Sequence, residues 1–332
     1  MAQASPHLQI PGMPDDLERV EDELHRSVET SDPFLTDVAG HLIRAGGKRM
    51  RPAFAVAAAA TRSGRDQDGR ATDDAVRGGV AVELVHLGSL YHDDVMDDAV
   101  TRRTVESVNA RWGNLKAILA GDFLLARASE IAASLGTEVA GLLAATIGRL
   151  CEGQIRELRD VYNVDRTEPD YFASIDGKTA ALFATACRIG GIVADLPREQ
   201  IETLTTFGRQ YGMAFQVVDD ILDLIASEEE LGKPVGHDLV EGVYTLPVLR
   251  ALGGPNGEAL REILGVPLDD AAKDEARSIV LRSGGVEVAV EIAQGFVDDA
   301  LGSLEQLDRT PAADGLAATA RHLIGRVTVS AG

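Results

Sequence analysis

Aromatic residues and cysteines are scarce in this chain of 332 residues. Phenylalanine, tyrosine and tryptophan together make up 4% of it, and the cysteines are Cys151 and Cys187. Neither cysteine belongs to a CxxC pair or stands near a pair of histidines, which excludes a disulfide scaffold and a cysteine zinc site. Both lie in apolar helical stretches, and we predict that they are small buried side chains.

Long apolar runs are also absent. A membrane-spanning helix needs about 18 or more apolar residues, and stretches such as TAALFATAC at 179–187 are about half as long. The N-terminus, MAQASPHLQIPGMPDD, has no basic region followed by an apolar core, so it does not resemble a signal peptide. We therefore predict a cytoplasmic protein. We also predict a flexible segment at 1–16 and a single domain at 17–330, because no long polar linker divides residues 17–330.

Positive charge is in deficit. Lysine and arginine number 32 against 53 aspartates and glutamates, which gives a net charge of −21. Such a chain repels nucleic acid and anionic membranes unless its basic residues are gathered locally. The sequence therefore predicts no nucleic-acid partner, and the places where basic residues do gather become informative.

Helical periodicity runs through almost the whole sequence. Segments such as LERVEDELHRSV and VEVAVEIAQGFVDDALGSLEQL repeat apolar residues with the helical period, and no stretch alternates convincingly with a period of two. Prolines fall at the apparent boundaries, where they begin helices or loops. These patterns predict an all-α protein of about a dozen helices, including a long one from Thr72 to Asp98 and another from Pro197 to Ala226.

An aspartate cluster ends the first long helix. Residues 87–100 read LGSLYHDDVMDDAV, with four aspartates in six positions after an apolar stretch. On a helix these carboxylates repel one another, and aspartate is a mediocre helix former. The cluster therefore requires either full exposure to solvent or a cation that binds several carboxylates together.

The same DDxxD spacing recurs in the second long helix. Residues 212–225 read GMAFQVVDDILDLI, in which Asp219, Asp220 and Asp223 repeat the spacing of the first cluster. Apolar side chains surround them, so most sides of this helix are expected to be buried. Two such helices facing each other would line a cavity with carboxylates, which divalent cations must neutralise. Oxygen ligands in this number favour Mg²⁺ or Mn²⁺, and Mg²⁺ commonly completes its coordination with phosphate oxygens.

Several basic residues lie beside glycine turns or beside the acidic clusters. In AGGKRMRP they follow a flexible glycine pair at a helix start, and an arginine pair closely follows the first acidic cluster. Cationic side chains in such places suit the binding of a diphosphate. The candidate phosphate ligands are Lys48, Arg49, Arg51, Arg102, Arg103, Lys178 and Lys233.

Together these motifs resemble those of the trans-isoprenyl diphosphate synthases, also called polyprenyl synthetases. The chain carries GGKRMRP, ELVHLGSLYHDDVMDD followed by RR, GKTA, GMAFQVVDDILD and LGKPVGHDL in the order and approximate spacing of that family. The resemblance extends from about Leu35 to Leu252. It implies a single-domain isoprenoid synthase fold, with about ten or more helices around a central cavity, and a homodimer.

The resemblance also implies the reaction, a head-to-tail condensation of isopentenyl diphosphate with an allylic diphosphate. The two aspartate motifs would face each other and bind about three Mg²⁺ that hold the allylic diphosphate. The implied metal ligands are Asp93, Asp97, Asp219 and Asp223. The implied ligands of the allylic diphosphate are Arg102, Lys178 and Lys233, and those of isopentenyl diphosphate are Lys48, Arg51, His86 and Arg103.

The chemistry of this reaction gives roles to further polar residues. Breaking the allylic C–O bond places negative charge on the leaving diphosphate, where metals and cationic side chains stabilise it. The Thr179 hydroxyl and the Gln216 amide would stabilise the carbocation without capturing it. The departing diphosphate would take the proton, so no separate base is required. The candidate catalytic residues are Asp93, Asp97, Lys178, Thr179, Gln216 and Asp219.

Two positions depart from the family pattern. Many relatives have glycine where this chain has Thr104, directly after Arg102 and Arg103, and many have lysine where it has Val243. The second change removes a cation expected beside the diphosphate, which leaves the contribution of that loop open.

Small residues precede the first aspartate motif on its helix. Gly88 and Ser89 stand five and four positions before Asp93, where short-chain relatives commonly place an aromatic ring. A growing tail anchored at Asp93 would meet these positions first. The sequence therefore predicts a long-chain all-trans polyprenyl diphosphate, a precursor of quinone side chains, released through peripheral contact with a membrane. Alternatively, Gly88 and Ser89 simply allow close helix packing.

Other functions stay open at this level. A short-chain farnesyl or geranylgeranyl diphosphate synthase would differ in product length. A class I terpene cyclase would carry an Asn/Ser/Glu metal motif in place of the second DDxxD. A non-catalytic subunit of a heterodimeric synthase would have eroded aspartate motifs, whereas both motifs are intact in this chain.

Overall fold

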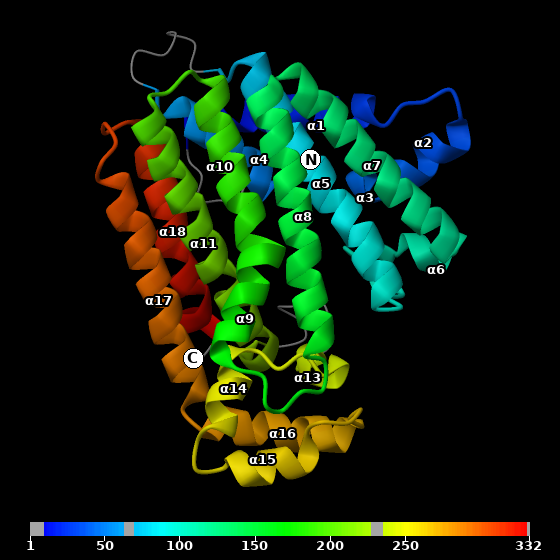
Figure 1. Cartoon of the computed structure of the whole chain (residues 1–332), viewed down its shortest axis with the longest axis vertical. Coiled ribbons are helices and arrows are strands. Elements are labelled where there is room, and N and C mark those ends of the chain that lie inside the picture. Colours follow the sequence, from blue (N-terminus) through cyan, green and yellow to red (C-terminus); the bar gives the residue numbers. More distant parts are fainter. Residues whose placement is uncertain (1–9, 63–69, 227–234, 331–332) are drawn as a thin grey trace. The chain divides into compact units, whose positions relative to one another are not determined.

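Helices make up most of the chain that the structure describes, which confirms the all-α class (Figure 1). The computed structural model describes residues 10–62, 70–226 and 235–330, so the predicted diphosphate ligand Lys233 lies outside the described residues. The helices are α1 (Met13–Ser27), α2 (Pro33–Ala39), α3 (His41–Arg44), α4 (Met50–Ala60), α5 (Asp73–Met96), α6 (Val108–Trp112), α7 (Asn114–Ser134), α8 (Thr137–Arg159), α9 (Glu168–Ile175), the π-helical turn η1 (Asp176–Ala180), α10 (Ala181–Val193), α11 (Arg198–Ile225), α13 (His237–Glu241), α14 (Leu246–Leu252), α15 (Gly257–Ile263), α16 (Asp270–Arg282), α17 (Gly285–Leu304) and α18 (Pro311–Ser330).

The two helices that carry the aspartate motifs have nearly the predicted bounds. Thr72 caps α5 through its hydroxyl oxygen, which accepts a hydrogen bond from the Ala75 amide at 3.2 Å. The helix ends at Met96, and Asp97 is its C-terminal cap. Asp98 follows with a φ of 46°, outside the helix, although its inclusion was predicted. α11 covers the predicted segment to within one residue at each end.

The chain packs as two compact units. Unit 1 comprises the described residues within Met1–Ile147, Leu182–Gly208 and Ser303–Thr319, and unit 2 comprises those within Gly148–Ala181, Arg209–Gly302 and Ala320–Gly332. Helix α1 begins at Met13, inside the segment predicted to be flexible. The predicted boundaries of a flexible segment at 1–16 and one domain at 17–330 stay a prediction.

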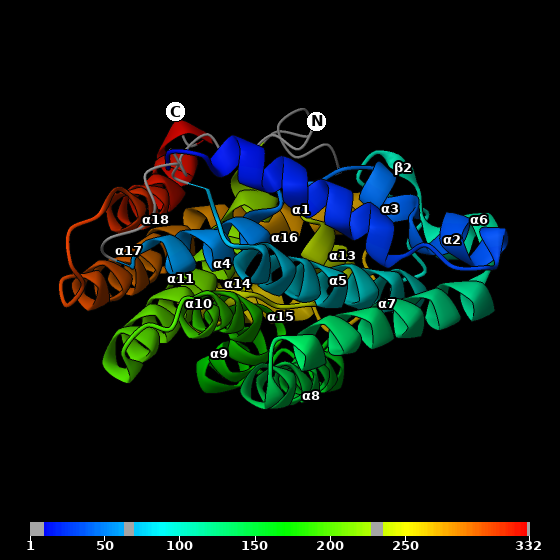
Figure 2. The ribbon, with the colours of Figure 1, turned by 90° about the horizontal axis from the view of Figure 1, so that it is seen from above.

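Small residues allow the helices of unit 1 to approach one another closely. α5 packs against α7, α4 and α1 (Figure 1, Figure 2). In α4 every residue from Pro52 to Ala60 is buried, and most of them are alanines. A Cβ atom on Gly190 of α10 would lie 2.2 Å from the Ala55 carbonyl oxygen, so this helix crossing requires glycine. The packing fixes the start of α4, where the GGKRMRP motif lies.

Unit 2 contains the second aspartate motif and the GKTA segment. α14, α15 and α16 pack against one another, and α9 packs against η1 and α14. The rings of Tyr171 and Phe172 in α9 pack edge to face with their centroids 5.3 Å apart. Phe172 meets Phe296 of α17 in the same manner at 5.9 Å. These contacts give α9 and η1, which carries Lys178 and Thr179, a packed support.

A short hairpin follows the first aspartate motif. Strand β1 (Thr101–Arg102) pairs antiparallel with β2 (Val105–Glu106), and no strand was predicted there. Two-residue strands are too short to show an alternating pattern. The turn residues Arg103 and Thr104 have φ values of 51° and 65°, and positive φ at both central residues is what a type I′ turn requires. The hairpin therefore holds Arg102 and Arg103 in different directions.

Thr104 occupies a backbone conformation that suits glycine better than threonine. Its side chain is exposed and β-branched, and such residues are strained at positive φ by about 1–3 kcal/mol. Glycine relieves this strain, but it costs about 0.5–1 kcal/mol through the entropy of the unfolded chain. We therefore expect Thr104→Gly to raise the free energy of unfolding by about 1 kcal/mol in urea titrations. The free energy of unfolding of Thr104→Ala should lie between those of the wild type and Thr104→Gly. A glycine variant that is no more stable than the wild type would contradict this account.

The two cysteines differ in burial. Cys187 on α10 is buried, as predicted, and its burial raises the pKa of the thiol. Cys151 on α8 is exposed, so the prediction for it was wrong. Ile155 and Leu158 of the same helix are 50% and 44% exposed, so α8 presents apolar residues at its surface. Among the described residues, no helix combines the length and apolar composition that crossing a membrane demands.

Candidate active site

The aspartates of the first motif differ in their surroundings. Asp93 is half-buried, Asp97 and Asp98 are exposed, and Asp94 is fully buried. The Asp94 carboxylate accepts a hydrogen bond from Arg102 Nε at 2.6 Å, and Arg102 Nη2 lies 2.6 Å from the same oxygen. Burial raises the pKa of the Asp94 carboxyl, and the Arg102 charge opposes that rise. Asp94 thus ties the hairpin to α5, while Asp93 and Asp97 are accessible.

The ion pair with Asp94 bears on the role predicted for Arg102. Its guanidinium was expected at the allylic diphosphate, and here it neutralises a buried carboxylate. The side chain is 32% exposed, so its remaining N–H groups are within reach of solvent. A diphosphate contact by Arg102 stays a prediction.

The aspartates of the second motif also differ in burial. Asp219 is exposed, whereas Asp220 and Asp223 are buried. Asp220 accepts hydrogen bonds from the Tyr171 hydroxyl at 2.6 Å and from Gln216 Nε2 at 2.8 Å. Burial raises the pKa of Asp220 to about 7, although both hydrogen bonds favour the charged form.

This hydrogen-bond chain continues to a predicted catalytic residue. The Thr179 hydroxyl donates to Gln216 Oε1 at 2.6 Å, so Thr179, Gln216, Asp220 and Tyr171 form one connected series within unit 2. Both polar ends of the Gln216 amide are used, which fixes its orientation. The structure thus brings Thr179 and Gln216 together, and adds Asp220 and Tyr171 as their supports.

Lys178 is held on a π-helical turn. A Cβ atom on Gly177 would lie 2.7 Å from the Arg149 carbonyl oxygen, and one on Gly153 would lie 2.4 Å from the Lys178 amide nitrogen. The α8 and η1 backbones can therefore touch only through these glycines. Lys178 Nζ donates to the Glu157 carboxylate at 2.5 Å. Single π-helical turns occur frequently at functional sites, because they redirect a side chain without ending the helix.

Positive charge gathers around His86 in unit 1. His86 is half-buried on α5, and its pKa is lowered well below the ordinary value, by burial and then by the charges of Arg51, Arg103, Arg49 and Arg102. The Arg51 guanidinium lies 4.7 Å from the centre of the Phe183 ring, and Lys48 is exposed nearby in the sequence. These four arginines form a cationic region, in which Arg49, Arg103 and Arg102 are paired with the carboxylates of Glu21, Glu83 and Asp94. Their N–H groups suit an anion such as diphosphate.

The Val243 segment is fixed by backbone contacts. Gly242 has a φ of 74°, and the Val243 amide donates to the Asp238 carbonyl at 2.8 Å. The buried Tyr244 hydroxyl accepts a hydrogen bond from the Gly265 amide at 2.6 Å. The loop is ordered without the lysine that the family pattern has there.

The residues present fit a divalent metal by their donor chemistry. Asp93 and Asp97 lie one turn apart at the end of α5, and Asp219 and Asp223 lie one turn apart near the end of α11. Carboxylate oxygens are hard ligands of the kind that Mg²⁺ binds. Within the described residues, no group of three or more acidic, histidine or cysteine side chains is already gathered into a metal site. Metal and diphosphate oxygens together would complete the coordination.

Sequence reasoning missed three kinds of residue at these sites. Asp94 and Asp220 belong to the aspartate motifs themselves, so the motifs identified these residues but did not indicate their supporting role. Tyr171 and Glu157, in contrast, are separated by 49 and 21 positions from the residues they contact. The third kind, the partners of Arg49, is equally remote in sequence.

Twin aspartate motifs and a cationic region on an all-helical chain are features that a metal-dependent enzyme acting on diphosphates requires. The polyprenyl synthetase family model matches residues 32–280. Nonaprenyl diphosphate synthase of Mycobacterium tuberculosis is 40% identical over 312 residues, covering 93% of this chain and 91% of that protein. Heptaprenyl diphosphate synthase component 2 of Geobacillus stearothermophilus is 40% identical over 294 residues, covering 88% and 90%.

Solved structures agree. A polyprenyl synthase from Caulobacter crescentus, complexed with calcium and isoprenyl diphosphate, superposes with a TM-score of 0.87 at 31% identity, covering 94% of this chain and 95% of that one. This chain belongs to the polyprenyl synthetase family. It is a prenyl diphosphate synthase of a divalent-metal-dependent family that uses isoprenyl diphosphates, and its relatives favour the long-chain type over the short-chain alternative.

Proposed function

We propose that this enzyme condenses isopentenyl diphosphate head to tail with an allylic diphosphate and repeats the step to a long all-trans product, a precursor of quinone side chains. The observation that carries the proposal is the cluster of arginines around a neutral His86, in the same unit as Asp93 and Asp97. Guanidinium groups that are held in place by carboxylates, as Arg102 is by Asp94 and Arg103 by Glu83, keep further N–H groups that can bind a diphosphate.

The metal-binding role is assigned to the first and last aspartates of each DDxxD motif, of which Asp223 is buried and the other three are at least partly exposed. We assign Asp93, Asp97, Asp219 and Asp223 as ligands of Mg²⁺, about three ions per active site, with Mn²⁺ as a substitute. When bound, the metal ions neutralise the charge that develops on the leaving diphosphate. Lys178, Arg102 and Lys233 would add cationic contacts to the same group. Asp220 and Asp94 would support this arrangement from buried positions.

The remaining residues divide between the second substrate and the carbocation. Lys48, Arg51, His86 and Arg103 would bind isopentenyl diphosphate. The Thr179 hydroxyl and the Gln216 carbonyl oxygen present dipoles, already paired with each other at 2.6 Å, that stabilise a carbocation without attacking it. The proton lost after condensation would pass to the diphosphate product.

The assembly proposed is a homodimer in the cytoplasm. Leu115, Ile118 and Leu119 of α7 are 73%, 41% and 57% exposed, and Phe34 on the neighbouring α2 is 48% exposed. An apolar surface of this kind commonly marks a protein interface. Two relatives are named as component 2 of a heptaprenyl diphosphate synthase, so a heterodimer is the alternative. The product would leave through peripheral contact with a membrane.

Product analysis tests the proposal directly. The purified chain alone is incubated with Mg²⁺, labelled isopentenyl diphosphate and each allylic primer separately, and the dephosphorylated products are sized. Products longer than about twenty carbons are expected, since the helix before Asp93 offers small side chains on one face for about three turns. A mixture that stops at about twenty carbons would identify a short-chain synthase, and no product without a second protein would identify a subunit of a heterodimer.

Substrate partition gives a second test. Arg103→Gln and Lys48→Gln should each raise the KM for isopentenyl diphosphate by about 10- to 100-fold and change the KM for the allylic primer by less than about threefold. Arg44→Gln is the matched control, because Arg44 lies in the same region but pairs with Asp37 at 2.7 Å on the surface. Equal increases for both substrates would show that the two diphosphate sites are wrongly assigned.

A further inference from the structure

Arg49 is fully buried although it stands between two candidate substrate ligands, Lys48 and Arg51. Its φ of 46° places it in the left-handed region, directly before α4 begins. A buried guanidinium is costly unless its N–H groups are paired with carboxylates. Its partners therefore decide how the GGKRMRP segment is held.

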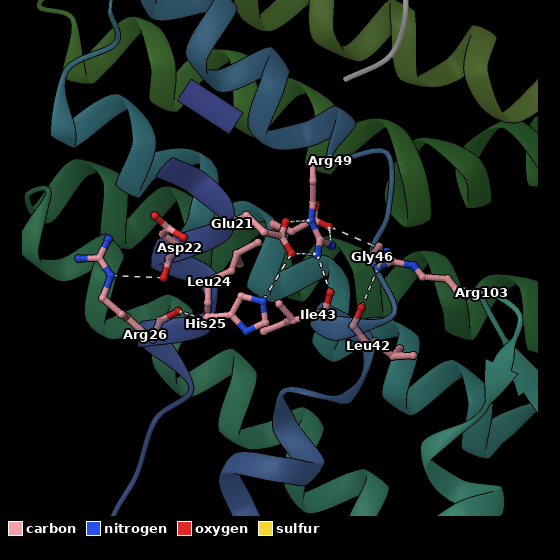
Figure 3. A network of polar contacts seen from close by, with 12 residues as sticks. Glu21, Asp22, Leu24, His25, Arg26, Leu42, Ile43, Gly46, Arg49 and Arg103 are labelled. Carbon is pink, nitrogen blue, oxygen red and sulfur yellow. Dashed lines mark hydrogen bonds and ion pairs between the residues drawn. The ribbon is translucent and has the colours of Figure 1, made fainter. Parts of the chain in front are cut away.

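Glu21 of α1 is the main partner of Arg49 (Figure 3). Arg49 Nε and Nη2 donate to the two oxygens of the Glu21 carboxylate, each at 2.8 Å, in a bidentate pair. Nη2 also donates to the Ile43 carbonyl at 3.0 Å, and Nη1 donates to the Glu83 carboxylate at 3.0 Å. Arg49 thus joins α1, the loop before α4, and α5.

The same contacts continue to Arg103. Glu83, which is 2% exposed, lies 3.9 Å from Arg103 Nη2 as well as against Arg49. Arg103 Nη1 donates to the Leu42 carbonyl at 3.1 Å and to the Gly46 carbonyl (Figure 3). A Cβ atom on Gly47 would lie 2.8 Å from Arg103 Nη1, so the glycine leaves the space that this guanidinium occupies. Arg103 is thereby fixed to the loop that carries Lys48.

The charges of this network balance. Two carboxylates, Glu21 and Glu83, face two guanidiniums, Arg49 and Arg103. Burial lowers the pKa of Arg49, but hydrogen bonds and charge from Glu21 and Glu83 outweigh it and raise the pKa above its ordinary value. Without Glu21, Glu83 would be drawn more strongly to Arg49, and its attraction for Arg103 would weaken.

We propose that Glu21 is a positioning residue for isopentenyl diphosphate, acting through Arg49 and Glu83 on Arg103 and the Gly46–Arg51 segment. It does not touch the substrate. Its carboxylate neutralises Arg49, which leaves Glu83 to orient Arg103 and fixes the loop that presents Lys48 and Arg51. The inference rests on the proposed binding of isopentenyl diphosphate by these residues.

Glu21→Gln is the variant that tests the proposal. Glu21 is 23% exposed, so the amide is tolerated, whereas loss of Arg49 would leave Glu83 buried without its main partner and endanger folding. We expect Glu21→Gln to raise the KM for isopentenyl diphosphate about tenfold, because small displacements of binding groups have effects of this size. The KM for the allylic primer and kcat at saturation should stay within about twofold. Glu21→Asp, which keeps the charge, should have a smaller effect.

Glu23→Gln is the matched control, since Glu23 lies on the same helix, is 26% exposed and pairs with Arg26 at 3.2 Å. It should leave both KM values unchanged. If Glu21→Gln lowers only the melting temperature, or raises both KM values equally, its role is structural and the proposal is overturned. Arg103→Gln distinguishes a failure of the assigned isopentenyl diphosphate site from a failure of the positioning role of Glu21. If that variant leaves the KM for isopentenyl diphosphate unchanged, the site assignment fails; if it raises the KM and Glu21→Gln does not, only the positioning role fails.

Discussion

Replacing Asp219 by alanine is expected to lower kcat by about a thousandfold, because loss of a metal ligand removes several kcal/mol of transition-state stabilisation. Asp219 is exposed at the end of a well-packed helix, so its removal should change the free energy of unfolding by less than about 0.5 kcal/mol. Asp93→Ala should lower kcat to a similar extent, since Asp93 is half-buried and is the first aspartate of the first motif, as Asp219 is of the second. Steady-state kinetics with circular dichroism measures both effects.

Asp98→Asn provides the control for charge within the same cluster. Asp98 is exposed, lies outside the proposed ligand set, and has a φ of 46°, which asparagine tolerates better than alanine. This variant should keep kcat within about threefold of the wild type. Chelation by EDTA should abolish activity, and added Mg²⁺ should restore it. Near-normal turnover in Asp93→Ala or Asp219→Ala would remove the basis of the metal assignment.

The sequence placed these aspartates on two helices but did not predict their different environments. Helical periodicity placed Asp93 and Asp97 on one face, and the repeated spacing placed Asp219 and Asp223 on another, because both inferences are local. The burial of Asp94 and Asp220 depends on Arg102 and Tyr171, which approach from other segments. A motif gives the order of residues on a helix, whereas tertiary packing decides which of them reach solvent.

The supports of the cationic region were not predictable for the same reason. Arg49 was assigned as a phosphate ligand from its place in GGKRMRP, and the structure shows it paired with carboxylates 28 and 34 positions away. Nothing in the local pattern of α1 distinguishes Glu21 from its acidic neighbours. The hairpin that presents Arg103 depends on positive φ values at Arg103 and Thr104, and arginine and threonine are not residue types that predict such a turn.

The packing of Gly88 changes the test of product length. A Cβ atom on Gly88 would lie 3.1 Å from the Gly121 carbonyl oxygen and 3.2 Å from the Leu125 side chain, both on α7. Gly88 therefore serves the close packing of α5 against α7, which was the alternative interpretation. Phenylalanine there would have to displace a neighbouring backbone, so Gly88→Phe is expected to destabilise the fold by about 3 kcal/mol or more. Its role in chain length stays a prediction that this variant cannot test.

Ser89 is the position at which product length can be tested. Its side chain is half-buried, and its hydroxyl donates to the His86 carbonyl of the same helix at 2.9 Å. Earlier on α5, Val85, Val82 and Ala81 are buried and small, so no aromatic ring interrupts this face. Ser89→Phe should place a ring across the path of a tail anchored at Asp93 and shift the products to about fifteen or twenty carbons.

Matched variants make the length measurement decisive. Ser134→Phe is the control, because Ser134 is exposed on α7 and its hydroxyl also bonds a carbonyl three residues earlier, at 2.6 Å. It should leave the product distribution unchanged. Total incorporation of labelled isopentenyl diphosphate should persist in Ser89→Phe, since the ring blocks the tail and not the diphosphates. If Ser89→Phe remains active and keeps the parental length, the growing chain does not pass this face of α5. Its route then has to be sought along another helix.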